Sequence, residues 1–128
     1  MYHAWYFLDG AYAVSIKKLP AAFYASRRGN EPVREWLKGL DNDVRKIIGQ
    51  DISDAEYGWP VGMPLCRSLG HGLFEVRSNI SGGRIARLIF APTRSHMILL
   101  HGFIKKTQKT PKRDLDLALK RKKEIENG

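Results

Sequence analysis

The chain has a single cysteine, Cys66, among its 128 residues. An internal disulfide is therefore excluded, and the cysteine content does not indicate an oxidising compartment. No apolar run approaches the roughly 20 residues that a membrane-spanning helix needs. The opening MYHAWYFLDG lacks the basic segment of a secretory signal and is interrupted by Asp9. We therefore expect a cytoplasmic protein with no membrane association.

Acidic residues are scarce in the second part of the chain, and the net charge of +9 arises there. Residues 1–76 hold nine Lys/Arg and nine Asp/Glu, whereas residues 77–128 hold thirteen and four, an excess of nine. Within 77–128, Asp114 and Asp116 are the only acids that precede Glu124. Such one-sided charge suits a polyanion, either a nucleic acid or an acidic protein segment, with a merely solvated surface as the alternative.

Two helices are predicted in the first half of the chain. PVREWLKGL follows Asn30, a capping-type residue, and contains an early proline. Asp41 is expected to cap a second helix over about residues 42–57, where apolar residues recur at helical spacing. A third helix is predicted after Pro111. Its narrow apolar stripe either packs on a sheet or is covered by a partner.

Strands are predicted for most of the remaining chain. One is expected at Leu19–Ala25, and four more follow the second helix, at LCRSL (65–69), GLFEVRS (72–78), RIARLIFAP (84–92) and HMILLHGFIKK (96–106). The short connections between these four imply an antiparallel meander. The sequence thus predicts an α+β fold, a small antiparallel sheet with two N-terminal helices packed on one face and a C-terminal helix.

The domain boundary is placed near residue 18. Residues 1–18 are predicted to form an N-terminal extension, and residues 19–128 the main domain. Within the extension, residues 4–16 contain two aromatic or β-branched runs around Asp9-Gly10, a dipeptide that is typical of hairpin turns. The extension is therefore either a β-hairpin or a flexible leader.

Cations are the reactive groups that the predicted strands bring together. The chain has no P-loop, no Cys/His cluster with zinc spacing and no paired carboxylates, so no metal or cofactor is expected. A period of two places Glu75 and Arg77 on one side of their strand, and Arg84 and Arg87 on opposite sides of the next. Neighbouring strands lie about 4.8 Å apart. Arg77, one of those two arginines and a lysine from Lys105–Lys106 can therefore converge, to bind a phosphodiester or to stabilise its transition state.

Much of the chain is similar to a known toxin family. GLFEVRSNISGGRIARLIFAPTRSHMILLHGFIKKTQKTP resembles the phage-derived branch of the RelE/HigB superfamily, whose members share the Glu-x-Arg strand, the Gly-Arg-x-x-Arg strand and the Leu-Leu-His-Gly-Phe-x-Lys-Lys-Thr-x-Lys-Thr-Pro motif. GNEPVREWLKGL and YGWPVGMPLCRSL also resemble this branch, so the similarity covers about residues 20–123. It implies a RelE-like fold and a toxin of a bacterial type II toxin–antitoxin pair.

The resemblance also implies an activity. Toxins of this family typically cleave mRNA in the ribosomal A site without a metal, by attack of a ribose 2′-OH on the adjacent phosphate to give a cyclic phosphate. Arg77 matches the arginine that contacts the scissile phosphate, and Arg84 and Arg87 match further phosphate contacts, with preference for the one on the face of Arg77. Lys105 and Lys106 match the basic pair that supplies the general acid.

Other residues of the same region are assigned supporting roles. The candidate general bases are His101 and Glu75. The candidate RNA-binding residues are Thr107, Lys109, Lys112 and Arg113. Because a free lysine has a pKa near 10.4 and is a poor base at neutral pH, we expect weak cleavage of naked RNA and dependence on the ribosome.

The resemblance further implies a cognate antitoxin, commonly a helix-turn-helix protein of the HigA type. Two alternative functions stay open. Relatives of the ParE type share the fold but poison DNA gyrase without nuclease activity, so the fold alone does not decide. A passive RNA-binding module is the third reading.

Overall fold

The computed structural model describes residues 2–4 and 17–127. The hairpin predicted at residues 4–16 lies outside the described residues except for its first position. Tyr2–Ala4 forms a short strand, β1, which pairs antiparallel with β2 (Ala21–Tyr24). The strand predicted at Leu19–Ala25 is thereby confirmed.

The other elements follow the predicted order. They are α1 (Pro32–Lys38), α2 (Asn42–Gly58), β3 (Cys66–Gly70), β4 (Leu73–Ile80), the short 3-10 helix η1 (Ser81–Gly83), β5 (Arg84–Pro92), β6 (Met97–Lys105) and α3 (Lys112–Asn127). The α+β fold with two N-terminal helices and a C-terminal helix is confirmed. Turn residues and hydrophobic periodicity were sufficient to locate these elements because both signals are local.

The sheet is mixed rather than wholly antiparallel. Strands β3, β4, β5 and β6 form the predicted antiparallel meander, and the described strands lie in the order β1-β2-β6-β5-β4-β3. Strand β2 pairs with β6 in parallel. The connection between these two strands contains α1, α2 and the first three strands of the meander, so no tight turn forces β2 to run antiparallel.

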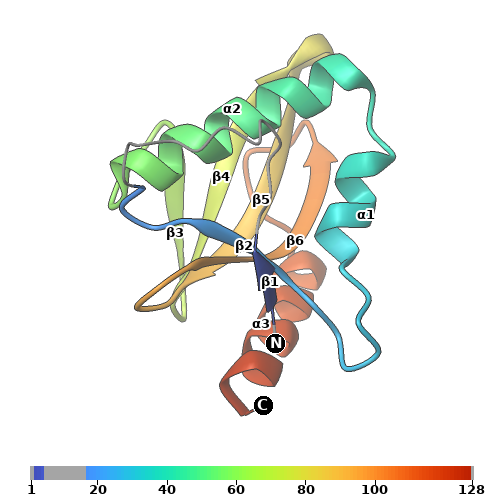
Figure 1. Cartoon of the computed structure of the whole chain (residues 1–128). Coiled ribbons are helices and arrows are strands. Elements are labelled where there is room, and N and C mark those ends of the chain that lie inside the picture. The colour runs from blue at the N-terminus through green and yellow to red at the C-terminus, as the bar shows by residue number, and fades with distance from the viewer. Residues whose placement is uncertain (1, 5–16, 128) are drawn as a thin grey trace.

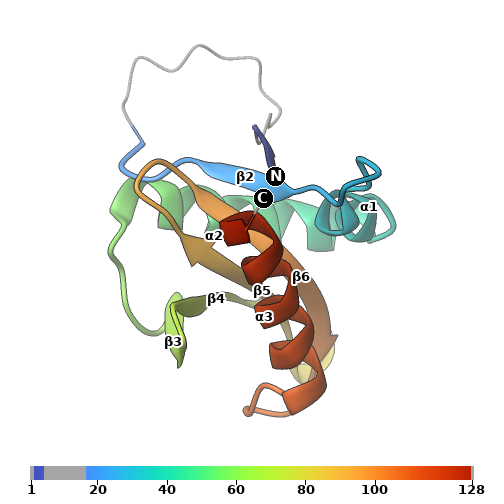
Figure 2. The same ribbon diagram turned by 90° about the horizontal axis from the view of Figure 1, so that it is seen from below.

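Helices cover both faces of the sheet. Helices α1 and α2 pack on one face, and α3 packs on the other, so that α3 lies in front of β5 and β6 in Figure 2 while α2 lies behind. Ile48 and Ile52 of α2 join a core with Leu88 and Phe90 of β5. Ala118 of α3 is fully buried in a second core, made with apolar side chains of β5 and β6. The apolar stripe of α3 therefore packs on the sheet.

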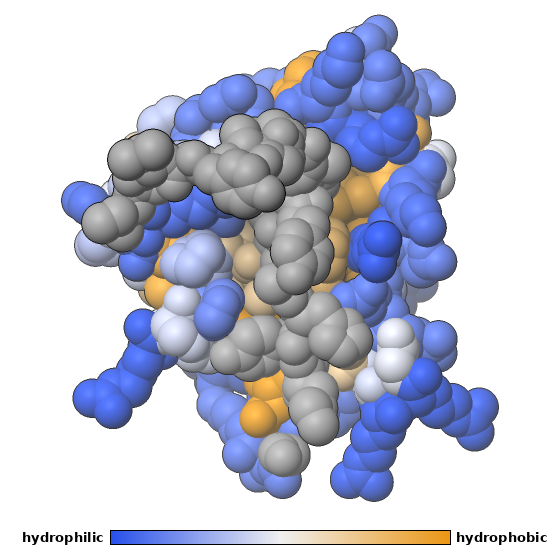
Figure 3. All heavy atoms as spheres, viewed as in Figure 1, coloured by the Kyte–Doolittle hydropathy of each residue, from blue (hydrophilic) through white to orange (hydrophobic). Residues whose placement is uncertain are grey.

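The outer surface is mostly hydrophilic. Figure 3, viewed as Figure 1, shows hydrophilic side chains around the periphery, with hydrophobic surface in patches between them. Trp59, at the end of α2, contributes to the core instead, with ring centroids 5.0 Å from Phe74 and 5.3 Å from Phe90. Within the described residues, no helix is both long and apolar enough to cross a membrane.

Candidate nucleic-acid interface

Three arginines from neighbouring strands share the sheet face that α3 covers. Arg67 lies on β3, Arg77 on β4 and Arg87 on β5. The register pairs Arg77 with Arg87, and it pairs Arg67 with Glu75, two residues before Arg77. Side chains of paired residues point to the same face of a sheet, so all four charged groups lie together. We call Arg67, Arg77 and Arg87 the arginine row.

Arg87 is entirely buried and binds the backbone of the segment that follows β6. Its Nη2 donates to the carbonyl oxygen of Thr107, and its Nη1 donates to that of Lys109 at 3.4 Å. The guanidinium also lies 5.8 Å from the ring centroid of Phe103. Burial lowers the pKa of Arg87, Glu75 opposes that shift, and the other two arginines of the row add to it. A guanidinium nevertheless stays charged at neutral pH, so Arg87 acts as a fixed internal cation.

Glu75 is the buried anion beside the arginine row. Its side chain is completely inaccessible, and both carboxylate oxygens accept hydrogen bonds. Oε1 accepts from Thr110 Oγ1 at 2.7 Å, and Oε2 accepts from Arg77 Nη1 at 2.6 Å. Both oxygens are therefore engaged inside the protein, which leaves Glu75 poorly placed to take a proton from a substrate hydroxyl.

Arg77 has a second guanidinium nitrogen, Nη2, which points away from Glu75 toward the segment that follows β6. Only 7% of its side chain is exposed, and Nη2 donates to Gln108 Oε1 at 3.0 Å. Arg67 Nη1 donates to the backbone carbonyl oxygen of the same residue, also at 3.0 Å. Two oxygens of Gln108 thus occupy two guanidinium groups.

The segment 106–110 crosses the face of the sheet above this row. Lys106, Thr107 and Lys109 of the segment are exposed. Lys105, the last residue of β6, is half-buried and pairs with Ile85, which places it on the face of the row. Lys105 therefore shares the sheet face of the arginine row, and the exposed Lys106 and Lys109 belong to the segment that binds this row.

Two predicted RNA-binding residues lie at the start of α3. Lys112 and Arg113 are both exposed, and Lys112 Nζ lies 2.8 Å from Asp116 Oδ2. This ion pair raises the pKa of Lys112.

Arg84 lies apart from the arginine row. Its Nε donates to the carbonyl oxygen of Ser81 at 3.0 Å, and it pairs with Ile80 at the far end of β4. Because alternation sends Arg84 and Arg87 to opposite faces, Arg87 is the arginine that shares the face of Arg77.

His101 faces α3 because of an irregularity in the sheet. The register between β5 and β6 shifts between Ile89 and Phe90, and both Leu100 and His101 contact the α3 side. His101 Nε2 lies 2.6 Å from Asp114 Oδ1 in α3. The role of His101 as a general base stays a prediction, since this nitrogen already has an internal partner.

A comparison of the sequence with known protein families identifies the family of this chain. Residues 35–123 match the family described as phage derived protein Gp49-like (DUF891). Those 89 residues, counted from 35 to 123, are more than half of the 128 in the chain. The chain belongs to the Gp49-like family. No curated protein matches the chain.

The matched region of this Gp49-like chain contains the whole arginine row and the segment 106–110. The family is associated with RelE-like and toxin-like proteins.

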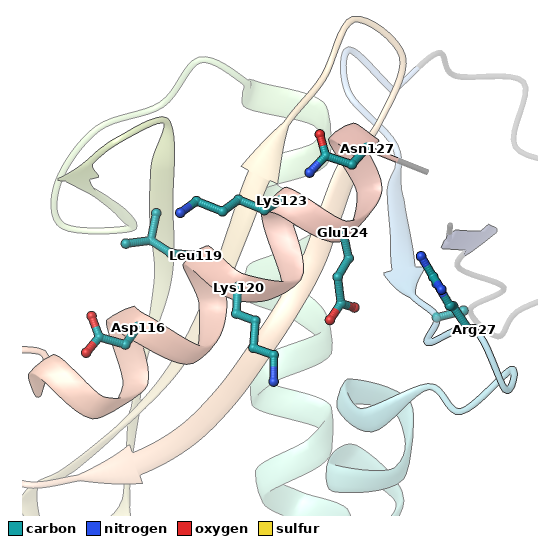
Figure 4. A pocket seen from close by; sticks show the side chains of 8 residues that line it. Arg27, Asp116, Leu119, Lys120, Lys123, Glu124 and Asn127 are labelled. Atoms are coloured by element: carbon teal, nitrogen blue, oxygen red, sulfur yellow. The ribbon is translucent and has the colours of Figure 1, made fainter.

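A groove of about 840 Å³ lies away from the arginine row, along the C-terminal half of α3. Arg27, on the loop after β2, lines it together with Lys120 and Lys123 of α3 (Figure 4). The carboxylate of Glu124 also lines the groove but accepts a hydrogen bond from the phenol of Tyr24. Burial and this contact raise the pKa of Tyr24 to about 12. Asp116 lines the groove as well, so three cationic and two acidic side chains surround it.

Two residues of this Gp49-like site were not singled out from the sequence. Arg67 lies in the strand predicted at residues 65–69, and its pairing with Glu75 follows from the β3–β4 hairpin. Extending the period-two argument one strand further would have found it. Gln108 lies beyond the last strand, where no periodicity applies, so its contact with Arg77 had no sequence signal.

Proposed function

We propose that this chain is the toxin of a type II toxin–antitoxin pair and acts as an endoribonuclease on mRNA held by the ribosome. The arginine row, with exposed Lys106 and Lys109 beside it, carries this proposal. A concentrated cationic face suits the phosphate backbone of RNA and the extra negative charge that forms at phosphorus during cleavage. Membership in a family associated with toxin-like proteins supports the same conclusion.

The proposed reaction is a transesterification. A ribose 2′-hydroxyl gives its proton to a base or a water molecule in the ribosomal complex, and its oxygen attacks the adjacent phosphorus. The bond from phosphorus to the 5′-oxygen breaks, and that oxygen takes up a proton. The products are a 2′,3′-cyclic phosphate and a free 5′-OH. Arg77 stabilises the charge on the phosphate, and Lys105 or Lys106 supplies the proton to the leaving oxygen, because an ammonium group is a donor.

The ribosome supplies orientation in this proposal. Both candidate bases, Glu75 and His101, hold internal partners, so neither of these two side chains is free to activate the 2′-hydroxyl. Positioning alone can contribute several kcal/mol to such a reaction. Ribosome-bound mRNA should therefore be cut far faster than naked RNA, and equal rates on the two substrates would contradict this requirement.

The test is inducible expression of the wild type and of Arg77→Ala, followed by primer extension on a cellular mRNA. We expect growth arrest and in-frame, translation-dependent cuts for the wild type, and loss of both for the variant. Arg84→Ala is the matched control, because it removes the same charge away from the row and should still cut. Circular dichroism of both purified variants checks that each is folded.

Glu75 and His101 both have internal partners, and this also favours a second candidate function. In that function the chain binds its target, DNA gyrase or RNA, and cleaves no RNA. A poison of DNA gyrase would arrest growth with mRNA intact and would inhibit supercoiling in vitro. A passive RNA-binding module would bind RNA in a salt-dependent way and would cause no arrest.

The proposed partner is a cognate antitoxin, of the helix-turn-helix HigA type. An acidic or amphipathic segment of such a partner would complement the basic side of the molecule. The groove lined by Arg27, Lys120 and Lys123 is a candidate surface for it (Figure 4).

A further inference from the structure

Gln108 presents two oxygen atoms to two neighbouring guanidinium groups. Its side-chain Oε1 lies 3.0 Å from Arg77 Nη2, and its backbone oxygen lies 3.0 Å from Arg67 Nη1. A phosphodiester also presents two oxygens, the non-bridging pair, and these carry a negative charge. Charged oxygens bind guanidinium groups more strongly than amide oxygens do. Gln108 therefore occupies donors that suit a phosphate better.

The backbone on both sides of Gln108 is held in place. Arg87 binds the carbonyl oxygens of Thr107 and Lys109, and Thr110 binds the buried carboxylate of Glu75. Gln108 itself is exposed. Its side chain can consequently leave Arg77 by a change of rotamer while the segment 106–110 stays where it is, and only one neutral hydrogen-bond acceptor is lost.

We infer that the Gln108 side chain is a replaceable internal ligand of Arg77, which an RNA phosphate displaces when RNA binds. Arg77 keeps Glu75 on Nη1 and exchanges Gln108 Oε1 for a phosphate oxygen on Nη2. Arg87 is then a positioning residue that holds the segment and does not contact the phosphate. The identity of the ligand rests on the proposed function, whereas the exchange itself rests on the contacts of Gln108.

The inference predicts that Gln108 weakens RNA binding by competing with it. A site that is partly occupied by its own side chain has an apparent affinity that is reduced by the fraction of time it is closed. Gln108→Ala removes the competitor and should tighten binding about fivefold, the effect of one hydrogen bond of ordinary net strength. Gln108→Glu replaces the amide with a carboxylate next to Arg77 and should weaken binding about tenfold.

The experiment measures binding of the full chain to a fluorescein-labelled, single-stranded 2′-O-methyl RNA of ten nucleotides by fluorescence anisotropy. This probe has no free 2′-hydroxyl and cannot be cleaved, so affinity is read without turnover. Gln50→Ala and Gln50→Glu are the matched controls. They make the same changes of size and charge on α2, where Gln50 Nε2 bonds Asp54 Oδ1 at 2.9 Å. Both controls should leave the affinity within about twofold.

A double-mutant cycle locates the effect. In an Arg77→Ala background, substitution of Gln108 should no longer change the affinity by more than the Gln50 controls do. Equal affinities of the wild type, Gln108→Ala and Gln108→Glu would overturn the inference, as would failure of both the wild type and Gln108→Ala to bind the probe. If the expected order holds but primer extension finds no mRNA cuts, the inference stands and the proposed nuclease activity fails.

Discussion

Arg87 is a charged side chain with no accessible surface, and its contacts explain how the protein tolerates it. Two backbone carbonyls accept from its guanidinium, the ring of Phe103 lies beneath it, and Glu75 lies in the same buried cluster. A buried charge is costly unless such partners replace its hydration. At the scale of single residues, Arg87 therefore connects the sheet to the segment 106–110.

Replacement of this residue should destabilise the protein. Arg87→Met fills much of the same volume but leaves the carbonyls of Thr107 and Lys109 without their donor, so we expect a loss of about 3 kcal/mol in the free energy of unfolding. Urea denaturation followed by circular dichroism measures this loss. Arg84→Met removes an arginine three positions away on the same strand and should cost less than about 0.5 kcal/mol. Equal losses for the two variants would show that Arg87 does not hold the segment.

At the scale of elements, Gly102 sets the distance between β6 and α1. A Cβ atom at this position would lie 2.4 Å from Cε3 of Trp36, well inside van der Waals contact. The indole of α1 therefore packs directly on the backbone of β6, and only a glycine permits that approach. This packing gives a structural reason for the glycine of the His-Gly-Phe motif.

Two alanine substitutions should have opposite effects for this reason. Gly102→Ala should lower the free energy of unfolding by about 2 kcal/mol, because Trp36 must move. Gly49→Ala, in α2, meets no atom within 4 Å and should raise it by up to about 1 kcal/mol, because alanine favours the helix. Thermal or urea unfolding of the three proteins compares them. If Gly102→Ala left the free energy of unfolding unchanged, α1 would have to be free to shift on the sheet.

At the scale of the whole molecule, the two layers of helices differ in charge. Residues 1–76, which include α1 and α2, hold equal numbers of acids and bases, whereas residues 77–128 carry the whole excess of nine. The segment 106–110 and α3 together hold eight Lys/Arg and four Asp/Glu, so they place a net charge of +4 on the side of the arginine row. Such an asymmetric field orients a polyanion toward one face of the protein.

This asymmetry should appear in the salt dependence of RNA binding. Each phosphate contact to single-stranded RNA contributes about 0.7 to the slope of log affinity against log salt concentration. Lys106→Gln should therefore reduce the slope by about 0.7, measured by anisotropy over a range of salt concentrations. Lys38→Gln, on α1, where the lysine pairs with Glu35 at 3.8 Å, should leave the slope unchanged. Equal changes for both lysines would indicate that net charge, and not the face, governs binding.

Local sequence patterns were enough to predict the helices and strands and part of the candidate site. Strand β5 begins and ends where its hydrophobic run does, at Arg84 and Pro92. The period of two correctly separated Arg84 from Arg87, and the β4–β5 register of the structure then showed that Arg87 is the one beside Arg77. These inferences hold because each depends only on neighbours in the chain or across one tight turn.

The sequence by itself thus determined the α+β class, the meander, the one-sided charge and the opposite faces of Arg84 and Arg87, and it left open which of these two shares the face of Arg77. Only the tertiary structure decided that β2 lies parallel to β6, that Arg87 is wholly buried, and that Gln108 occupies Arg77. These features join residues 20 or more positions apart, where no periodicity links the partners. The partner of Arg77 Nη2 depends on how the segment 106–110 folds back over the sheet. That path is decided by tertiary packing.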